Sequence, residues 1–174
     1  MRNMLLETTR LYVRKFTPDD AQALMSILGD EDIMHFSRSG VMTLEKIKES
    51  LANFYIPNYT AHGFGMYAVI QKSDNQLIGI CGFFIEQIDG QRHIELAYRI
   101  AKKYWGQGFA TEAAIALKQY AHNVLGIKEL ISIIDPTNIA SKRVAEKVGM
   151  SLWKKTISHD IPVLIYIIKM IKKQ

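Results

Sequence analysis

The chain contains apolar segments typical of strands and segments whose apolar residues recur at helical spacing. The order of these segments restricts the possible folds more than any other feature of the sequence. The order is β-α-α-β-β-β-α-β-α-β-β, with no linker, repeat or low-complexity stretch. Strands are expected at 11–16, 65–70, 77–85, 93–100, 129–134, 150–156 and 163–171, and helices at 17–29, 43–58, 110–125 and 139–148. This order predicts an α/β (α+β) fold, a mixed sheet flanked by helices, in one domain over residues 1–174.

Composition places the chain among globular proteins. Its 174 residues are enough to bury a core, and 48% hydrophobic with 22% charged residues fits neither a disordered nor a membrane protein. No apolar run reaches the roughly 18 residues that span a bilayer. Met1–Thr9 lacks the apolar centre of a signal peptide, and the lone Cys81 cannot form an internal disulfide. We therefore expect a cytoplasmic protein without a membrane partner.

The net charge of +5 favours an anionic partner, either nucleic acid or a phosphorylated cofactor. No basic stripe interleaved with aromatic residues is present, so nucleic acid is the weaker hypothesis. The five histidines show no metal-ligand spacing, and we expect no metal. Cys81 lies in an apolar segment, which predicts a buried thiol and not a nucleophile.

The first segment with a chemical signature is Tyr104–Glu112 (Tyr-Trp-Gly-Gln-Gly-Phe-Ala-Thr-Glu), between an expected strand and an expected helix. Glycines at this junction let backbone N–H groups converge, and the helix N-terminus adds partial positive charge, which suits a phosphate or pyrophosphate. A turn needed only for chain reversal explains the glycines equally well, because short glycine patterns are weak signals. The segment is neither a dinucleotide fingerprint nor a P-loop.

The second segment is Asn138–Met150, one strand further along the chain. Asn138 is a good helix N-cap and Gly149 a good helix stop, so local structure alone explains both positions. That interpretation does not account for Ser141, one turn after the capping asparagine and close to the end of the preceding strand.

The two segments together resemble the GCN5-related N-acetyltransferase (GNAT) family, and within it the branch that acetylates N-terminal alanine or serine amines of ribosomal proteins. The resemblance runs from Leu6–Arg14 to about Met150. It implies a GNAT-type acyl-CoA N-acyltransferase fold with a mostly antiparallel sheet of about seven strands. It also implies acetyl-coenzyme A (acetyl-CoA) as co-substrate and a primary amine as acceptor.

The family's pyrophosphate loop reads glutamine or arginine, two residues, glycine, one residue, then glycine or alanine. Trp105, Gly108 and Ala110 occupy those positions here, and Trp105, common in the ribosomal-protein branch, departs from the general pattern by removing one polar contact. Asn138 matches the asparagine that contacts the pantetheine arm. The resemblance implies cofactor contacts at Ile100, Trp105, Gly106, Gln107, Gly108, Phe109, Ala110, Thr111, Asn138 and Ser141.

Two catalytic roles are expected. Many relatives protonate the leaving thiolate with a tyrosine seven residues beyond the asparagine, but Ala145 stands there, so Ser141 or water is the expected proton source. A primary amine must be neutral to attack a thioester, which calls for a general base. Glu95 lies where relatives often carry that base, although an ordinary solvated strand glutamate also fits. Tyr98 has the opposite strand parity, so it is expected in the core.

The acceptor is open at this point. A protein N-terminal α-amine, a polyamine, an amino acid and an aminoglycoside are all candidates, and the oligomeric state is a monomer or a homodimer. A sensor that binds acetyl-CoA without turnover is the alternative from another class, since the family tyrosine is replaced by Ala145.

Overall fold

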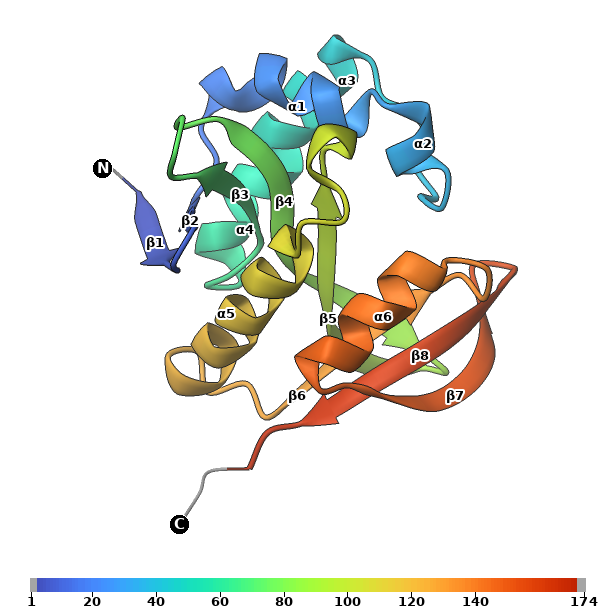
Figure 1. Ribbon diagram of the computed structural model, residues 1–174. Coiled ribbons are helices and arrows are strands. Elements are labelled where there is room, and N and C mark those ends of the chain that lie inside the picture. The colour runs from blue at the N-terminus through green and yellow to red at the C-terminus, as the bar shows by residue number, and fades with distance from the viewer. Residues whose placement is uncertain (1–2, 172–174) are drawn as a thin grey trace.

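The computed structural model describes residues 3–171, in which an eight-stranded sheet carries helices on both faces (Figure 1). The strands lie in the order β1-β2-β3-β4-β5-β6-β8-β7, and neighbours are antiparallel except for β5 and β6. The strands are β1 (Met4–Glu7), β2 (Leu11–Arg14), β3 (Met66–Gln71), β4 (Leu77–Ile88), β5 (Gln91–Ile100), β6 (Glu129–Ile134), β7 (Ser151–Ser158) and β8 (Ile161–Lys169). The helices are α1 (Ala21–Leu28), α2 (Glu31–Met34), α3 (Leu44–Ser50), α4 (Ile56–Ala61), α5 (Phe109–Asn123) and α6 (Ile139–Val148).

The predicted mixed, mostly antiparallel sheet flanked by helices is confirmed, and β6 and α6 begin and end at the predicted residues. The structure adds β1, whose four residues show no clear alternation of burial and which is held by pairing with β2. It also adds α2, capped by Asp30, whose carboxylate accepts a hydrogen bond from the Ile33 N–H. The predicted domain extends to residues 1–2 and 172–174, which lie outside the described residues.

The helix predicted over residues 43–58 is interrupted in the structure. A π-helical turn, Leu51–Tyr55, separates α3 from α4. Pro57 lies at the start of α4 and has no N–H to donate, and its ring would clash with the carbonyl four residues earlier in a regular α-helix. The wider turn removes that clash while the chain continues in nearly the same direction.

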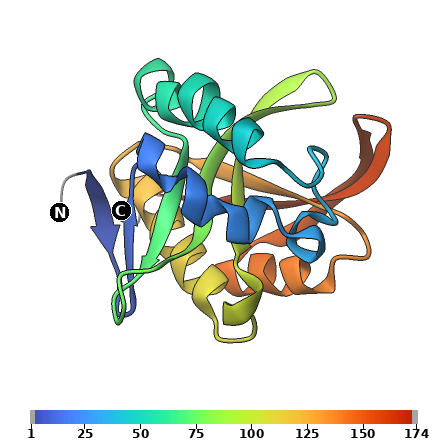
Figure 2. The same cartoon turned by 90° about the horizontal axis from the view of Figure 1, so that it is seen from above.

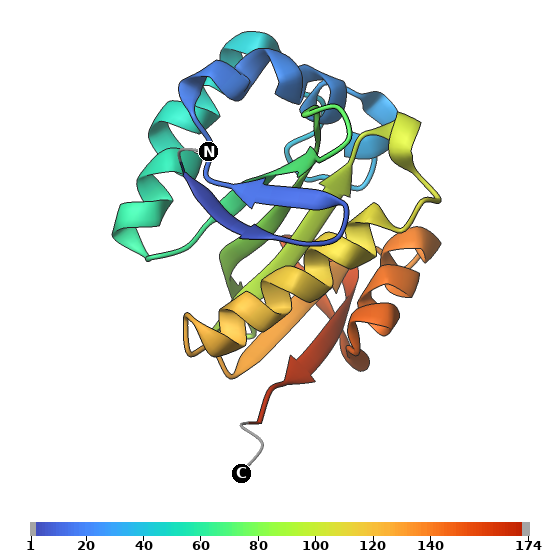
Figure 3. The same ribbon diagram turned by 60° about the vertical axis from the view of Figure 1, so that its left-hand side comes forward.

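The two faces of the sheet carry separate hydrophobic clusters. On one face α5 and α6 lie side by side (Figure 3), and Ala113 and Leu117 of α5 pack on Leu96 of β5. On the other face α1–α4 form a layer (Figure 2), and its cluster includes Ile47 of α3 and, at its margin, Ala97 of β5. Successive residues of β5 therefore face opposite layers, as the period of a strand requires.

The structure also places the lone cysteine and the groups that could bind a metal ion. Cys81 is fully buried, as predicted, and burial raises the pKa of its thiol. Within residues 3–171, no group of three His, Cys, Asp or Glu side chains is placed to hold a metal ion. No helix in that range is long and apolar enough to cross a membrane.

The sheet opens between β5 and β6. β5 pairs with β4 along its whole length, and β6 pairs with β8 along its whole length, but β5 and β6 share only the paired position Glu95–Ile131. Because each strand is held by its outer neighbour, the two diverge beyond that point without unravelling. Backbone groups of both strands on the edges of the opening are left without a neighbouring strand.

Gly82 of β4 is required by close approach of the backbone. A Cβ atom there would lie 2.3 Å from the Gly65 carbonyl oxygen and 2.7 Å from the Met66 Cα, so β3 would have to shift. We expect Gly82→Ala to lower the free energy of unfolding by about 1–3 kcal/mol, the usual cost of overpacking, as measured by urea denaturation. Gly65→Ala is the matched control, because its nearest contact is the Tyr59 side chain at 3.3 Å. Equal losses in the two variants would contradict this explanation.

Candidate active site

A cavity of about 560 Å³ occupies the opening between β5 and β6 and extends to the loop before α5. It brings together residues from β5, the loop, the end of β6 and α6, as well as Asp32, Ile33, Phe36 and Ser37 from the α2 region. Of the site residues predicted from the sequence, those that line it are Glu95, Ile100, Trp105, Gly106, Gly108, Phe109, Ala110, Thr111, Asn138 and Ser141. Gln107 does not line it.

The loop before α5 depends on two left-handed glycines. Gly106 has φ +73° and Gly108, the N-cap of α5, has φ +80°, a conformation that side-chain-bearing residues rarely adopt. A Cβ on Gly106 would meet nothing within 4 Å, so the backbone angle and not space requires glycine there. Among residues 3–171 no side chain caps the first N–H groups of α5, which leaves them available to a bound anion at the cavity.

Trp105 attaches this loop to the end of β5. Its indole Nε1–H donates a hydrogen bond to the Ile100 carbonyl at 2.7 Å, while about half of the side chain stays exposed. The polar contact that the family's usual residue would offer is therefore replaced by an internal bond that fixes the loop.

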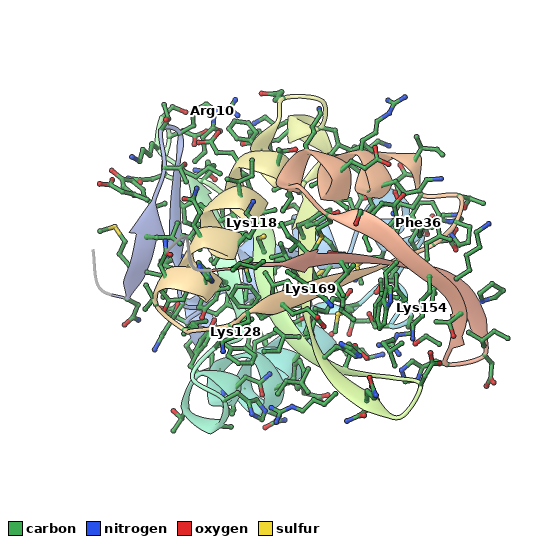
Figure 4. The ribbon with its side chains drawn as sticks, turned by 90° about the horizontal axis from the view of Figure 1, so that it is seen from below. Arg10, Phe36, Lys118, Lys128, Lys154 and Lys169 are labelled. Carbon is green, nitrogen blue, oxygen red and sulfur yellow. The ribbon has the colours of Figure 1, made fainter. Side chains whose placement is uncertain are left out.

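Arg10 holds the loop before α5 in place through hydrogen bonds. This role was not predicted from the sequence. It lies at the β1–β2 turn beside the start of α5 (Figure 4). Its Nε donates to Glu112 Oε2 at 2.7 Å, its Nη1 donates to the Gln107 carbonyl at 2.9 Å, and its guanidinium carbon lies 4.2 Å from the centre of the Phe109 ring. Because 102 residues separate Arg10 from Glu112, no local pattern indicates this contact.

The bond from Arg10 orients a peptide group. In a trans peptide the C=O and the following N–H point in opposite directions. Since the Gln107 carbonyl points to Arg10, the Gly108 N–H points away from Arg10, and Gly108 lines the cavity. This arrangement also explains why Gln107 itself is turned from the cavity, with its side-chain Nε2 on the Lys103 carbonyl at 3.3 Å.

Glu112 carries a negative charge in the first turn of α5, close to the place expected for phosphates. Burial acts to raise the pKa of Glu112, but hydrogen bonds from Thr8 and Arg10 outweigh it and lower the pKa, so the carboxylate is ionised. Its Oε1 accepts from the Thr8 hydroxyl at 2.6 Å and from the Arg10 backbone N–H at 2.9 Å. Arg10 thereby neutralises a carboxylate that would otherwise repel an anion.

Asn138 and Ser141 lie at the start of α6. Asn138 Oδ1 accepts a hydrogen bond from the Ser141 N–H at 3.0 Å, so it is an N-cap as well as a cavity residue. The Ser141 hydroxyl donates to Tyr98 Oη at 3.2 Å, and the Tyr98 hydroxyl donates to the Ser141 carbonyl at 2.8 Å. Tyr98 packs against the α5–α6 cluster, as its parity predicts, but its hydroxyl reaches the cavity wall. Burial raises the pKa of Tyr98, which stays protonated.

Glu95 lies where β5 and β6 begin to diverge. Its Oε1 accepts a hydrogen bond from the Ile133 N–H, at 3.3 Å, one of the backbone groups freed by the opening. Burial, followed by the nearby Glu86 carboxylate, raises the pKa of Glu95 to about 7. Glu86 is itself paired with Arg38 at 3.0 Å. A carboxylate that changes protonation near neutral pH is suited to accepting and returning a proton.

A sheet that opens between two parallel strands, with a glycine loop suited to an anion at one end of the opening and a titratable carboxylate at the other, fits the architecture expected of a GNAT-type N-acyltransferase. Residues 10–151 match the family described as "Acetyltransferase (GNAT) domain". The chain belongs to this family and is an acetyl-CoA-dependent N-acetyltransferase.

Several known proteins are similar to this chain in sequence or in fold. The chain is 32% identical over 162 residues to the uncharacterized protein YkkB of Bacillus subtilis, covering 92% of this chain and 93% of that protein. It is similar to the crystal structure of a GNAT-family acetyltransferase from Bacillus anthracis, with TM-score 0.81 and 27% identity over 95% of this chain and 98% of the other. A RimL ribosomal L7/L12 α-N-protein acetyltransferase in complex with coenzyme A shares the fold, with TM-score 0.81 and 18% identity over 96% and 98% of the two chains.

Arg10→Gln removes the support of the loop and leaves Glu112 uncompensated. We expect the dissociation constant for coenzyme A to rise about tenfold, the worth of one charge-assisted hydrogen bond, while the fold persists, as measured by titration calorimetry. Adding Glu112→Gln should recover part of the affinity, because the unpaired negative charge is then removed.

Arg92→Gln is the control for this prediction. Arg92 is exposed near the β4–β5 turn, and its replacement removes the same formal charge without touching the loop. Affinity that falls equally in Arg92→Gln and Arg10→Gln would show a general charge effect and contradict a specific role for Arg10.

Proposed function

We propose that this protein transfers an acetyl group from acetyl-CoA directly to a primary amine within a ternary complex, with Glu95 as the general base. The observation that carries the proposal is the position of Glu95. A carboxylate with a pKa of about 7 lies in the same cavity as the loop suited to the cofactor's phosphates, and at the point where the sheet opens.

The cofactor follows the opening in this proposal. The pyrophosphate lies at the backbone N–H groups of the loop and the start of α5, and Asn138 faces the pantetheine arm. Arg143 and Lys147, which line the cavity from α6, supply positive charge for the remaining phosphate. The acetyl end then lies near Glu95, because β5 runs from the opening to the loop.

The amine must lose a proton before or during attack, and its pKa of about 8 for an α-amine or about 10.4 for a lysine keeps it charged at neutral pH. Glu95 accepts this proton, directly or through a water molecule. The neutral nitrogen attacks the thioester carbon, the C–S bond breaks, and the thiolate of coenzyme A leaves. Free backbone N–H groups of the diverging strands stabilise the oxyanion formed on the way.

The leaving thiolate takes its proton from Ser141. Ala145, at the position of the family's tyrosine, is fully buried and offers no proton. The Ser141 hydroxyl lines the cavity and is held by Tyr98, whose own hydroxyl is fixed by the Ser141 carbonyl. Tyr98 therefore positions the serine, and the serine oxygen regains the proton that it gives to the thiolate from solvent water.

The direct test of this function is thiol release. The protein is incubated with acetyl-CoA and a panel of primary amines, including peptides with free N-termini, polyamines, amino acids and an aminoglycoside, and acetylated products are identified by mass spectrometry. Acceptor-dependent thiol release supports an enzyme. Binding of acetyl-CoA without release by any acceptor would favour the sensor.

Glu95→Gln keeps the shape of the side chain but removes its ability to accept a proton. We expect kcat to fall about a hundredfold while the affinity for acetyl-CoA stays unchanged. Glu95 must be ionised to act, so wild-type kcat should fall as pH decreases below about 7. In the variant, kcat should not show this decrease. Its defect should shrink at high pH, where solvent deprotonates the amine.

Glu49→Gln, on the exposed surface of α3, is the control for loss of a glutamate.

A raised pKa means that the folded state binds the proton of Glu95 more tightly than the unfolded state, so ionisation lowers stability as pH rises toward 7 and above. The Glu95→Gln protein should therefore be at least as stable as the wild type at pH 8. Near-wild-type turnover at pH 7 would remove Glu95 from the mechanism.

Ser141→Ala and Tyr98→Phe separate donation of the proton from its positioning. We expect Ser141→Ala to lower kcat with little change in stability, because the hydroxyl makes no contact needed for the helix cap. Tyr98→Phe should lower kcat less, since the serine remains but is no longer held. Steady-state kinetics with one acceptor measures both. Turnover unchanged in Ser141→Ala would assign the proton to water.

A further inference from the structure

Arg99 is a charged residue of the cavity that the mechanism above does not use. It lies near the end of β5, lines the cavity, and donates from Nη2 to the Ser37 hydroxyl at 3.2 Å. Across residues 3–171, no carboxylate lies within 4.0 Å of its guanidinium. Its direct hydrogen-bond partner in that range is a neutral hydroxyl, and the Glu95 carboxylate acts on its charge from a longer distance.

A partly buried arginine without a carboxylate partner is unusual among the arginines of this protein. In the described part of the chain only Arg14 and Arg99 are partly buried, and the rest are exposed. Arg14 has the expected partner, with Asp20 accepting two hydrogen bonds at 2.8 and 2.7 Å. A guanidinium withdrawn from water is costly unless an anion compensates it. Within residues 3–171 no anion is in direct contact with Arg99, so a ligand is the natural source of one.

The cofactor does not fit this role. Side chains alternate along β5, so Arg99 lies on the same face as Ala97 and Glu95, toward α1–α4, while Tyr98 and Ile100 face α5. The glycines of the loop lead into α5, and Arg143 and Lys147 lie on α6, and both helices belong to the opposite layer. In the function proposed above the phosphates of coenzyme A thus have their own cations, and Arg99 lies on the face of β5 that is left for the acceptor.

The face of β5 that carries Arg99 presents two charged groups to the cavity, Glu95 and Arg99. The Cα atoms of Glu95 and Arg99 are about 13 Å apart along the strand, and both side chains extend into the same cavity. The charge of Arg99 is close enough to lower the pKa of Glu95, against the stronger effect of burial. Phe36, 42% exposed, forms a wall of this end and lies far from Arg10 (Figure 4).

We propose, on the basis of the function proposed above, that the acceptor carries a carboxylate as well as its primary amine, and that Arg99 binds this carboxylate. The amine then faces Glu95 and the anion faces Arg99, which fixes the direction in which the acceptor lies. Two sources share this chemistry. One is a free amino acid, and the other is a peptide N-terminus followed by an acidic side chain.

The experiment compares matched acceptors that differ only in the anion. Each free amino acid is paired with its α-carboxamide, and each peptide with aspartate at its second position is paired with the asparagine peptide. kcat/KM is measured for the wild type, Arg99→Gln, Arg99→Lys and the control Arg92→Gln. Because every ratio is compared between proteins, differences in amine basicity cancel.

We expect the ratio of kcat/KM for the carboxylate member to that for its uncharged partner to be about tenfold higher in the wild type than in Arg99→Gln for at least one kind of pair, the effect of one charge-assisted hydrogen bond. KM for acetyl-CoA should not change in Arg99→Gln, so the loss is confined to this preference for the carboxylate. Arg99→Lys should retain part of it, and Arg92→Gln all of it. A preference confined to amino acids identifies the free α-carboxylate, and one confined to peptides identifies an acidic N-terminal sequence.

The failures are distinguishable. A ratio of kcat/KM between the carboxylate member and its uncharged partner that is the same in Arg99→Gln as in the wild type for every pair overturns the role of Arg99 and leaves the proposed function intact. A wild type that releases no thiol with any acceptor overturns both.

Discussion

The site depends on the incomplete pairing of β5 with β6. Each strand satisfies its backbone on the outer side, β5 with β4 and β6 with β8, so the sheet tolerates an opening between them. A parallel pair joined through α5 makes this possible, because the connecting helix brings the loop to the end of β5 and fixes the distance between the strands. The cavity, the free backbone groups and the environment of Glu95 all follow from this one departure from regular pairing.

The opening also separates two kinds of chemistry. On the face of α5 and α6 lie the glycine loop, Asn138 and the cations of α6, which suit phosphates. On the face of α1–α4 lie Glu95 and Arg99, with Glu86 and Arg38 nearby. In the proposed function, donor and acceptor would approach from opposite layers and meet at the edge of β5, a geometry that fits direct transfer in a ternary complex.

Support for the loop comes from a distant part of the chain. The β1–β2 turn carries Thr8 and Arg10, which hold Glu112 and the Gln107 carbonyl, and Trp105 ties the loop to the end of β5. Backbone N–H groups bind an anion well only when they are oriented in advance. The N-terminal hairpin, although at the edge of the sheet, is thus connected to the conformation of the site.

Local chemistry in the sequence was enough to determine most of the elements and both chemical segments of this protein. The apolar segment Glu129–Ile134 and the caps of Ile139–Val148 predicted both elements to the residue, and the glycines of the loop and Asn138, expected from the family resemblance to contact the cofactor, line the cavity. These features depend on interactions within a few residues, so they can be recognised in a single sequence. Alternation along β5 likewise placed Glu95 and Tyr98 on opposite faces.

Only the tertiary structure decided which charges meet. Arg10 and Glu112 are 102 residues apart, Tyr98 and Ser141 are 43 apart, and Arg99 and Ser37 are 62 apart. The pKa of Glu95 rises because folding withdraws it from water and brings Glu86 near. The π-turn before Pro57 and the strand β1 likewise depend on packing and pairing. Burial and long-range contact are properties of the folded chain, since they arise only when distant segments exclude water from a common volume.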